Sequence, residues 1–232
     1  MVSMTAYAQK APEIYRIFDA KGKEVTYEKM IKSVAGSDVV FFGEIHNCVI
    51  SHWMELKVLE SLAENNSKLK VGMEMLEADN QLIIDEYTGS VISSDRFEEE
   101  CRLWPNYSTD YEPLVYYSKR HHLPLIATNV PRRYASVVKE KGLVYLDSLS
   151  DEAKRYLPKL PIKYVENENA QSGFALMGLM GKAKDSKPEY RPKTTVSTIR
   201  AVRQEEIDKI DEDYLGLADF YICITEDMNM SY

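Results

Sequence analysis

The chain has 232 residues, of which 44% are hydrophobic and 28% are charged. This composition excludes intrinsic disorder of the whole chain, and the length is sufficient for one large domain with its own core. The formal net charge of -8 argues against nucleic acid as the main partner, because proteins that bind nucleic acid present clustered basic residues.

The first residues contain a small-x-small pattern, Ala6-Tyr7-Ala8, with Gln9 after it. A pattern of this kind precedes signal-peptidase cleavage sites and indicates export. The alternative is a disordered leader, because the charged and apolar regions of a signal peptide are largely missing. We therefore expect residues 1–12 to be a flexible leader or signal-peptide remnant. Residues 13–232 are expected to form a single α/β domain with an irregular segment around 158–193.

Short apolar runs alternate with helical segments along the chain, which is typical of an α/β fold with a mainly parallel sheet. The run Val39–Phe42 predicts a buried strand over 38–44, and the apolar spacing after it predicts a helix over 49–64. A second strand over 69–75 again ends on a carboxylate, Glu74. The other expected elements, in chain order, are helices over 77–88 and 93–102, a helix capped by Ser108–Asp110, a strand over 123–130, helices over 132–140 and 151–157, and strands over 194–202 and 219–225.

Polar residues follow three of these strands: Glu44 and His46 follow the first, Glu74 the second, and Asn129 and Arg132 the third. Right-handed crossovers bring the ends of successive parallel strands to one edge of a sheet, where α/β proteins place their ligand sites. We therefore expect a shared pocket. Its predicted members are Glu44, His46, Glu74 and Asn129, with His52 of the following helix as a secondary member.

Glu44, His46 and Glu74 could serve such a pocket in two ways. Imidazole with carboxylates suits a divalent cation, and two carboxylates in a partly desolvated pocket also suit acid and base chemistry. The structural alternative is a hydrogen-bonded polar plug at the sheet edge.

Several motifs, in this order, resemble the ChaN-like haem-binding family. The resemblance extends from about residue 36 to 135, with a closing segment after residue 200. It is carried by Gly43-Glu44-Ile45-His46, His52, Gly72-Met73-Glu74-Met75, Tyr111-Glu112-Pro113-Leu114, Ile126–Arg132, Arg203-Gln204-Glu205 and Ala218–Tyr221.

The resemblance implies a three-layer α/β/α fold and an exported, periplasmic or outer-membrane-associated bacterial protein of iron supply. It also implies a homodimer that holds haem at its interface through tyrosine, with an outer-membrane haem transporter as a candidate partner. One departure concerns a late strand ending in Gly-x-x-His, which is not recognisable between Ala170 and Thr194. All four histidines precede residue 123.

A haem site needs an apolar slot, an axial ligand and a cation for the propionates, and tyrosinate suits ferric iron. Tyr134 is the first candidate ligand, because it follows a strand end and neighbours Arg132 and Arg133, which could hold an anionic group. The further candidate ligands are Tyr111, Tyr116 and Tyr117.

The leading hypothesis is therefore a non-catalytic haem-binding protein of bacterial iron acquisition, with haem as its cofactor at a surface or dimer-interface site. The rival hypothesis is a hydrolase, either esterase-like or metal-assisted, that uses Glu44, His46 and Glu74, as the esterase-like and Tiki-like relatives of the family imply. A third interpretation is a scaffold protein whose pocket has degenerated.

Overall fold

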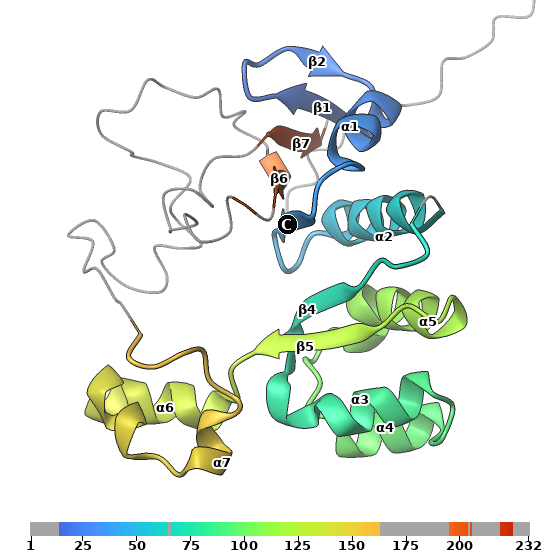
Figure 1. Ribbon diagram of the computed structural model, residues 1–232. Helices are drawn as coiled ribbons and strands as arrows, with labels where there is room; N and C mark the ends of the chain where they lie inside the picture. Colours follow the sequence, from blue (N-terminus) through green and yellow to red (C-terminus); the bar gives the residue numbers. More distant parts are fainter. Residues whose placement is uncertain (1–13, 65, 163–194, 204, 206–218, 225–232) are drawn as a thin grey trace, which may run out of the picture. The chain divides into compact units, whose positions relative to one another are not determined.

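The computed structural model describes residues 14–64, 66–162, 195–203, 205 and 219–224 (Figure 1). The chain divides into two compact units. Unit one comprises Met1–Leu62 with Ser186–Tyr232, and unit two comprises Ala63–Asp185. The expected leader 1–12, most of the irregular segment 158–193 and the region 170–194 lie outside the described residues.

Unit one contains a five-stranded sheet in the order β2-β1-β7-β6-β3. Every ladder in this sheet is antiparallel, and Val39 and Glu44 at the two ends of β3 pair with Val202 and Ser197. The expectation of a mainly parallel sheet is therefore not confirmed, although the fold is α/β as expected. The strands are β1 (Tyr15–Asp19), β2 (Glu24–Val25), β3 (Val39–Glu44), β6 (Thr195–Val202) and β7 (Phe220–Ile224).

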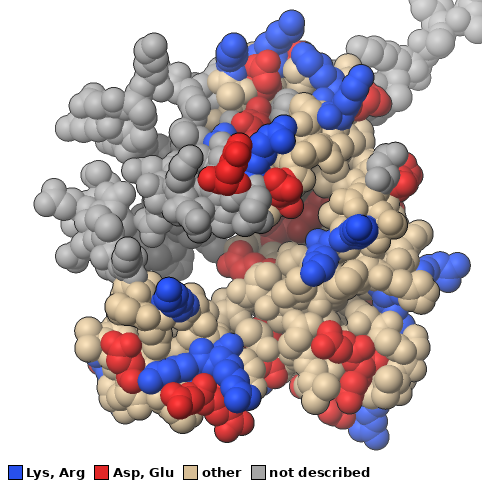
Figure 2. Space-filling view, in the orientation of Figure 1, with Lys and Arg blue, Asp and Glu red and all other residues tan. Residues whose placement is uncertain are grey.

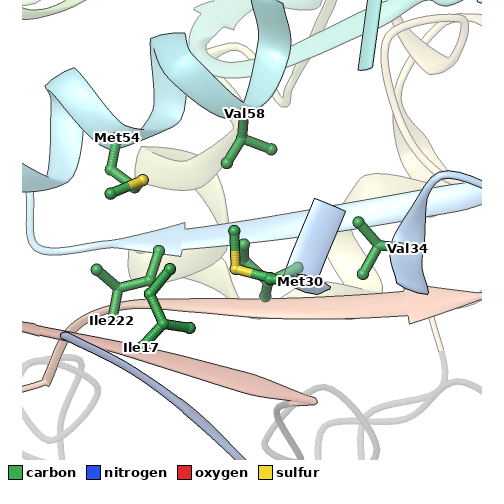
Figure 3. Packing of buried hydrophobic residues seen from close by; sticks show 7 residues of the cluster. Ile17, Met30, Val34, Met54, Val58 and Ile222 are labelled. Atoms are coloured by element: carbon green, nitrogen blue, oxygen red, sulfur yellow. The ribbon is translucent and has the colours of Figure 1, made fainter. Parts of the chain in front are cut away.

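Two helices pack on this sheet, α1 (Tyr27–Val34) and α2 (Val49–Glu64). Thr26 begins α1 because its side chain accepts the backbone N–H of Lys29 at 3.2 Å. The core contains Met54 and Val58 of α2, which point toward the buried strand residues (Figure 3). Its buried members are Ile17, Met30, Val34, Met54, Val58, Ile199 and Ile222.

A buried polar contact also joins α2 to β6. The Ser51 hydroxyl lies 2.6 Å from the Ser197 hydroxyl and donates to the Val196 carbonyl at 3.1 Å. Both serines are fully buried, so these hydrogen bonds satisfy groups that would otherwise be costly to bury.

Unit two contains two parallel strands, β4 (Val71–Glu77) and β5 (Leu125–Asn129). The Gln81 amide binds the backbone of β5, accepting from Ala127 N–H and donating to Leu125 C=O, both at 2.8 Å. The α-helices are α3 (Gln81–Thr88), α4 (Ser94–Glu100), α5 (Glu112–Arg120), α6 (Arg132–Lys141) and α7 (Asp151–Lys154). Short 3-10 helices cover Ala78–Asn80 and Leu143–Ser148, and a π-helical turn covers Tyr107–Tyr111.

Most expected elements of the described ranges occur within two or three residues of their predicted bounds. The shift of two residues in the second strand matters for the site, because the strand covers Val71–Glu77 rather than 69–75. Glu74 is therefore an exposed residue within β4, and the carboxylate at the strand end is Glu77. Among the described helices, none combines the length and apolar character that a membrane span requires.

Candidate functional site

The parallel strands of unit two end on polar residues that lie next to each other. Glu77 ends β4 and is paired in register with Asn129 at the end of β5. The Glu77 side chain is only 4% exposed. A buried carboxylate is costly unless it is paired with cations and hydrogen-bond donors, so its partners define the site.

Two arginines supply those partners, and a third binds the neighbouring Asp79. Arg132 donates its backbone N–H to Glu77 Oε2 at 3.1 Å and its Nε to Oε1, and Arg102 donates its Nε to Oε2 at 3.0 Å. Asp79 is shared in the same way, since its Oδ1 accepts from Arg102 Nη2 and its Oδ2 accepts from Arg133 Nη1. We call these five residues the arginine network. Three guanidinium groups against two carboxylates leave it with a net positive charge.

The network shifts the pKa values of Glu77, Asp79, Arg102 and Arg133. Burial by itself raises the pKa of both carboxyl groups, but hydrogen bonds and charge from the arginines outweigh burial. The net result is a lowered pKa for Glu77 and for Asp79. The pKa of Arg133 is raised, chiefly by its hydrogen bond to Asp79. Both carboxyl groups are therefore ionised at neutral pH.

Tyr134 lies at one end of the network. Arg133 Nη2 donates to the Tyr134 hydroxyl at 3.4 Å, and the guanidinium carbon lies 4.5 Å from the centre of the tyrosine ring. Tyr134 is 9% exposed, so most of its ring is packed while its hydroxyl has a cationic neighbour.

Arg132 lies at the other end, with a side chain that is 60% exposed. Its Nε and backbone N–H bind Glu77, while its two Nη atoms have no partner among the residues that the structure describes. The space-filling view shows basic and acidic side chains side by side over α6 and α7 (Figure 2). The exposed guanidinium edge can bind a further anion, because its planar donors match a carboxylate.

The other candidate tyrosines are placed differently. Tyr111 is completely buried and lies edge-on to Trp104, with ring centres 6.0 Å apart, so in this structure it is a core residue. Tyr117 is half-buried and stacks on His121 at 4.1 Å, whereas Tyr116 is 54% exposed on α5. Tyr134 alone of these four residues lies beside Arg133.

A second polar cluster lies in unit one, where β3 ends and α2 begins. Glu44 is 5% exposed, and its two oxygens lie 2.8 Å from His46 Nδ1 and 3.0 Å from His52 Nε2. Glu55 of α2 is hydrogen-bonded to Glu44. Burial, together with the charge of Glu44 and a hydrogen bond to it, raises the pKa of Glu55 to about 8. The Glu55 carboxyl group therefore retains its proton at neutral pH.

The structure brings Glu44, His46 and His52 together in unit one, while Glu74 and Asn129 belong to unit two. The expected pocket shared by all five residues stays a prediction. Within the described ranges, no group of three or more His, Cys, Asp or Glu side chains is placed to hold a metal ion, so a divalent cation has no support.

Four residues of these two clusters were not predicted from the sequence: Glu55, Glu77, Asp79 and Arg102. Glu55 follows His52 by three residues on α2, a spacing that places both on one helix face and could have indicated it. Arg102 lies 25 residues from Glu77, and no local pattern links the two.

Comparison with known proteins gives a consistent picture. The family model described as haem-binding uptake, Tiki superfamily, ChaN matches residues 30–207, which confirms the resemblance seen in the sequence motifs. A solved structure described as cofacial heme binding to ChaN of Campylobacter jejuni matches with a TM-score of 0.55 and 20% identity. That match covers 72% of this chain and 63% of the other, so the present chain spans less than two thirds of that protein. No curated protein matches the sequence.

Proposed function

Because the chain belongs to the ChaN family of haem-binding uptake proteins in the Tiki superfamily, we propose that it binds haem through Tyr134 and the arginine network. The observation that carries this proposal is the contact between Arg133 and Tyr134, 3.4 Å from donor nitrogen to phenolic oxygen. Ferric iron prefers an anionic oxygen ligand, and a guanidinium donor stabilises negative charge on a phenolate.

The residues present fit the charges of haem. When bound, haem supplies a ferric iron and two propionates, and unit two offers a tyrosine for the iron and an exposed guanidinium edge for a propionate. Arg132 fills the second role, because Glu77 binds its Nε while the side chain stays 60% exposed. The net positive charge of the arginine network favours an anionic ligand over a neutral one.

Membership of this family is also the basis for a proposal about the wider role of the protein. We propose a non-catalytic, homodimeric protein of bacterial iron acquisition that is exported to the periplasm or the outer membrane and passes haem to an outer-membrane transporter. The Campylobacter structure, described as cofacial heme binding to ChaN, supports haem as the ligand. The small-x-small pattern at Ala6–Ala8 supports export.

A haemin titration followed by absorbance tests the ligand assignment. Wild-type protein is expected to bind haemin with a shifted Soret band, and Tyr134→Phe is expected to lose that band because phenylalanine cannot ligate iron. Tyr145→Phe is a matched control, since Tyr145 also lies under a cation, with Lys141 Nζ 4.2 Å from its ring centre. Equal binding by both variants would overturn the assignment of Tyr134.

The propionate contact has its own test. Arg132→Gln is expected to weaken haemin binding about tenfold, because one charge-assisted contact is worth roughly 1.5 kcal/mol or more. The same substitution should leave the affinity for haemin dimethyl ester unchanged, since the ester carries no carboxylate. An equal loss of affinity for haemin and for the dimethyl ester would mean that Arg132 does not bind a propionate.

A second candidate function is hydrolysis in unit one, favoured by the 2.8 Å contact between Glu44 and His46. A carboxylate at Nδ1 orients an imidazole so that Nε2 can act as a general base. This candidate predicts esterase activity that disappears in His46→Ala and persists in the exposed control His121→Ala.

A further inference from the structure

The backbone of Arg102 is held in place independently of the contacts of its side chain. It follows α4, and its N–H donates to the Asn80 side-chain oxygen at 3.0 Å. The Cys101 thiol lies 3.7 Å from the same oxygen. Asn80 is 3% exposed, so this anchor is a buried part of unit two.

The side chain of Arg102 bridges the two acidic residues of the arginine network. Its Nε donates to Glu77 and its Nη2 donates to Asp79, so one rigid, planar group holds both carboxylates. The opposite oxygen of each carboxylate binds another arginine, Arg132 on Glu77 and Arg133 on Asp79. Arg102 is therefore the centre of a continuous series of contacts that ends at Arg132 on one side and at Tyr134 on the other.

We propose that Arg102 is a positioning residue for haem, which sets the placement of the Arg132 guanidinium relative to the Tyr134 hydroxyl. This inference rests on the proposed function and deepens it. Arg132 and Tyr134 are two residues apart on the first turn of α6, and their backbone spacing is set by the helix. The directions of the Arg132 and Arg133 side chains are instead set by Glu77 and Asp79, which Arg102 holds.

Loss of Arg102 would act on both ends of the site. Two carboxylates would then face two arginines, and the surplus positive charge would vanish. Glu77 and Asp79 would also repel each other more strongly, because the cation that bridges them would be gone. Both changes draw Arg132 and Arg133 toward the carboxylates and away from a ligand.

Haemin affinity and resonance Raman spectra of the ferric complex test this role. Arg102→Gln is expected to lower haemin affinity about ten- to a hundredfold and to weaken the iron–tyrosinate bands. The matched control is Arg96→Gln, which removes the same charge from an exposed pair with Glu99 on α4 and is expected to behave like wild type. Unchanged affinity and bands in Arg102→Gln would overturn the proposal.

Two further variants separate position from charge and from folding. The double variant Arg102→Gln/Asp79→Asn restores the net positive charge without the bridge, and it is expected to bind as weakly as Arg102→Gln. Recovery of wild-type affinity and bands would show that charge alone matters and would overturn the proposal.

If Arg102→Gln fails to fold, Arg102→Lys serves instead. Lysine keeps the charge without the planar fork, so the same losses of affinity and bands are expected, and wild-type values would overturn the proposal.

The outcomes also separate this inference from the proposed function. If Tyr134→Phe removes the tyrosinate bands while every Arg102 variant resembles wild type, the haem site stands and the positioning role fails. If wild-type protein binds no haemin, or Tyr134→Phe leaves the bands intact, both fail.

Discussion

Arg132 is bound to Glu77 by two of its own groups, across 55 residues of sequence. Its backbone N–H donates to one carboxylate oxygen at 3.1 Å, and its Nε donates to the other. The backbone contact places a negative charge at the first turn of α6, where the helix dipole favours it. The side-chain contact directs the guanidinium of Arg132. One buried carboxylate thus fixes both the start of the helix and the cation proposed to bind a propionate.

Glu77→Gln is expected to destabilise unit two by about 1–3 kcal/mol at pH 7, because two arginines lose a buried charged partner. The lowered pKa of Glu77 means that its ionic stabilisation is present above the unfolded pKa of about 4.3 and is lost as pH falls through the lower folded value. The stability gap between wild type and Glu77→Gln should therefore shrink between pH 5 and pH 2.

Urea unfolding of the two proteins at pH 7 and at pH 3 measures this gap. Glu99→Gln is the control, since Glu99 pairs with Arg96 at the surface and an exposed pair contributes little. A gap that is equal at both pH values would show that Glu77 does not act through its charge.

Glu55 in unit one predicts a pH dependence of stability opposite to that of Glu77. The pKa of Glu55 is raised to about 8, so the folded state holds a proton that the unfolded chain releases near pH 4.3. Stability should fall as pH rises from about 4.5 to about 8. Glu55→Gln mimics the protonated carboxyl and should reduce this fall by at least about 1 kcal/mol. Denaturation at pH 5 and at pH 8.5 checks it, and parallel losses in both proteins would contradict the assignment.

Gly43 leaves no room for a side chain where β3 meets β6. A Cβ at this position would lie 2.7 Å from the Thr198 hydroxyl oxygen of the paired strand. Gly43→Ala is expected to cost about 1–3 kcal/mol of stability through this overlap. The cost should be smaller in a Thr198→Ala background, and a double-mutant cycle measures the difference. Additive losses would mean that the overlap is not the cause.

The core of unit one can be tested with two valines of α2. Val58 is 4% exposed within the core, whereas Val49 is 66% exposed on the same helix. Val58→Ala should lower the free energy of unfolding by about 1–3 kcal/mol, because it leaves a cavity. Val49→Ala should change it by less than about 0.5 kcal/mol. Similar effects of the two changes in chemical denaturation would contradict the placement of α2.

Strand β3 and helix α2 were predictable from the sequence because their signals are local. The apolar run 39–42 and the helical spacing after it place both elements within one residue of their observed bounds. Strand direction is not encoded in that way. β3 and β6 are antiparallel neighbours, but a long stretch of chain separates them in the sequence. The alternation of apolar residues within a strand is the same for parallel and antiparallel pairing, so it does not reveal the direction.

The candidate site was chosen from local signals in the same way. The sequence singles out Tyr134, Arg132 and Arg133 because they are adjacent after a strand, and the structure places Arg133 beside Tyr134. Their role in haem binding stays a prediction. Glu77 was missed because β4 continues past Glu74 with Met75 and Leu76 buried, so the strand end could not be located from the pattern. Glu77 is buried because arginines from distant segments neutralise it, which is a tertiary effect that no sequence window contains.

A crystal structure of the protein with haemin would decide whether Tyr134 is the iron ligand. We expect iron bound to the Tyr134 hydroxyl oxygen, with a propionate on the Nη atoms of Arg132 while Arg102 still bridges Glu77 and Asp79. Iron bound to any other side chain, with the arginine network untouched by the propionates, would contradict this expectation.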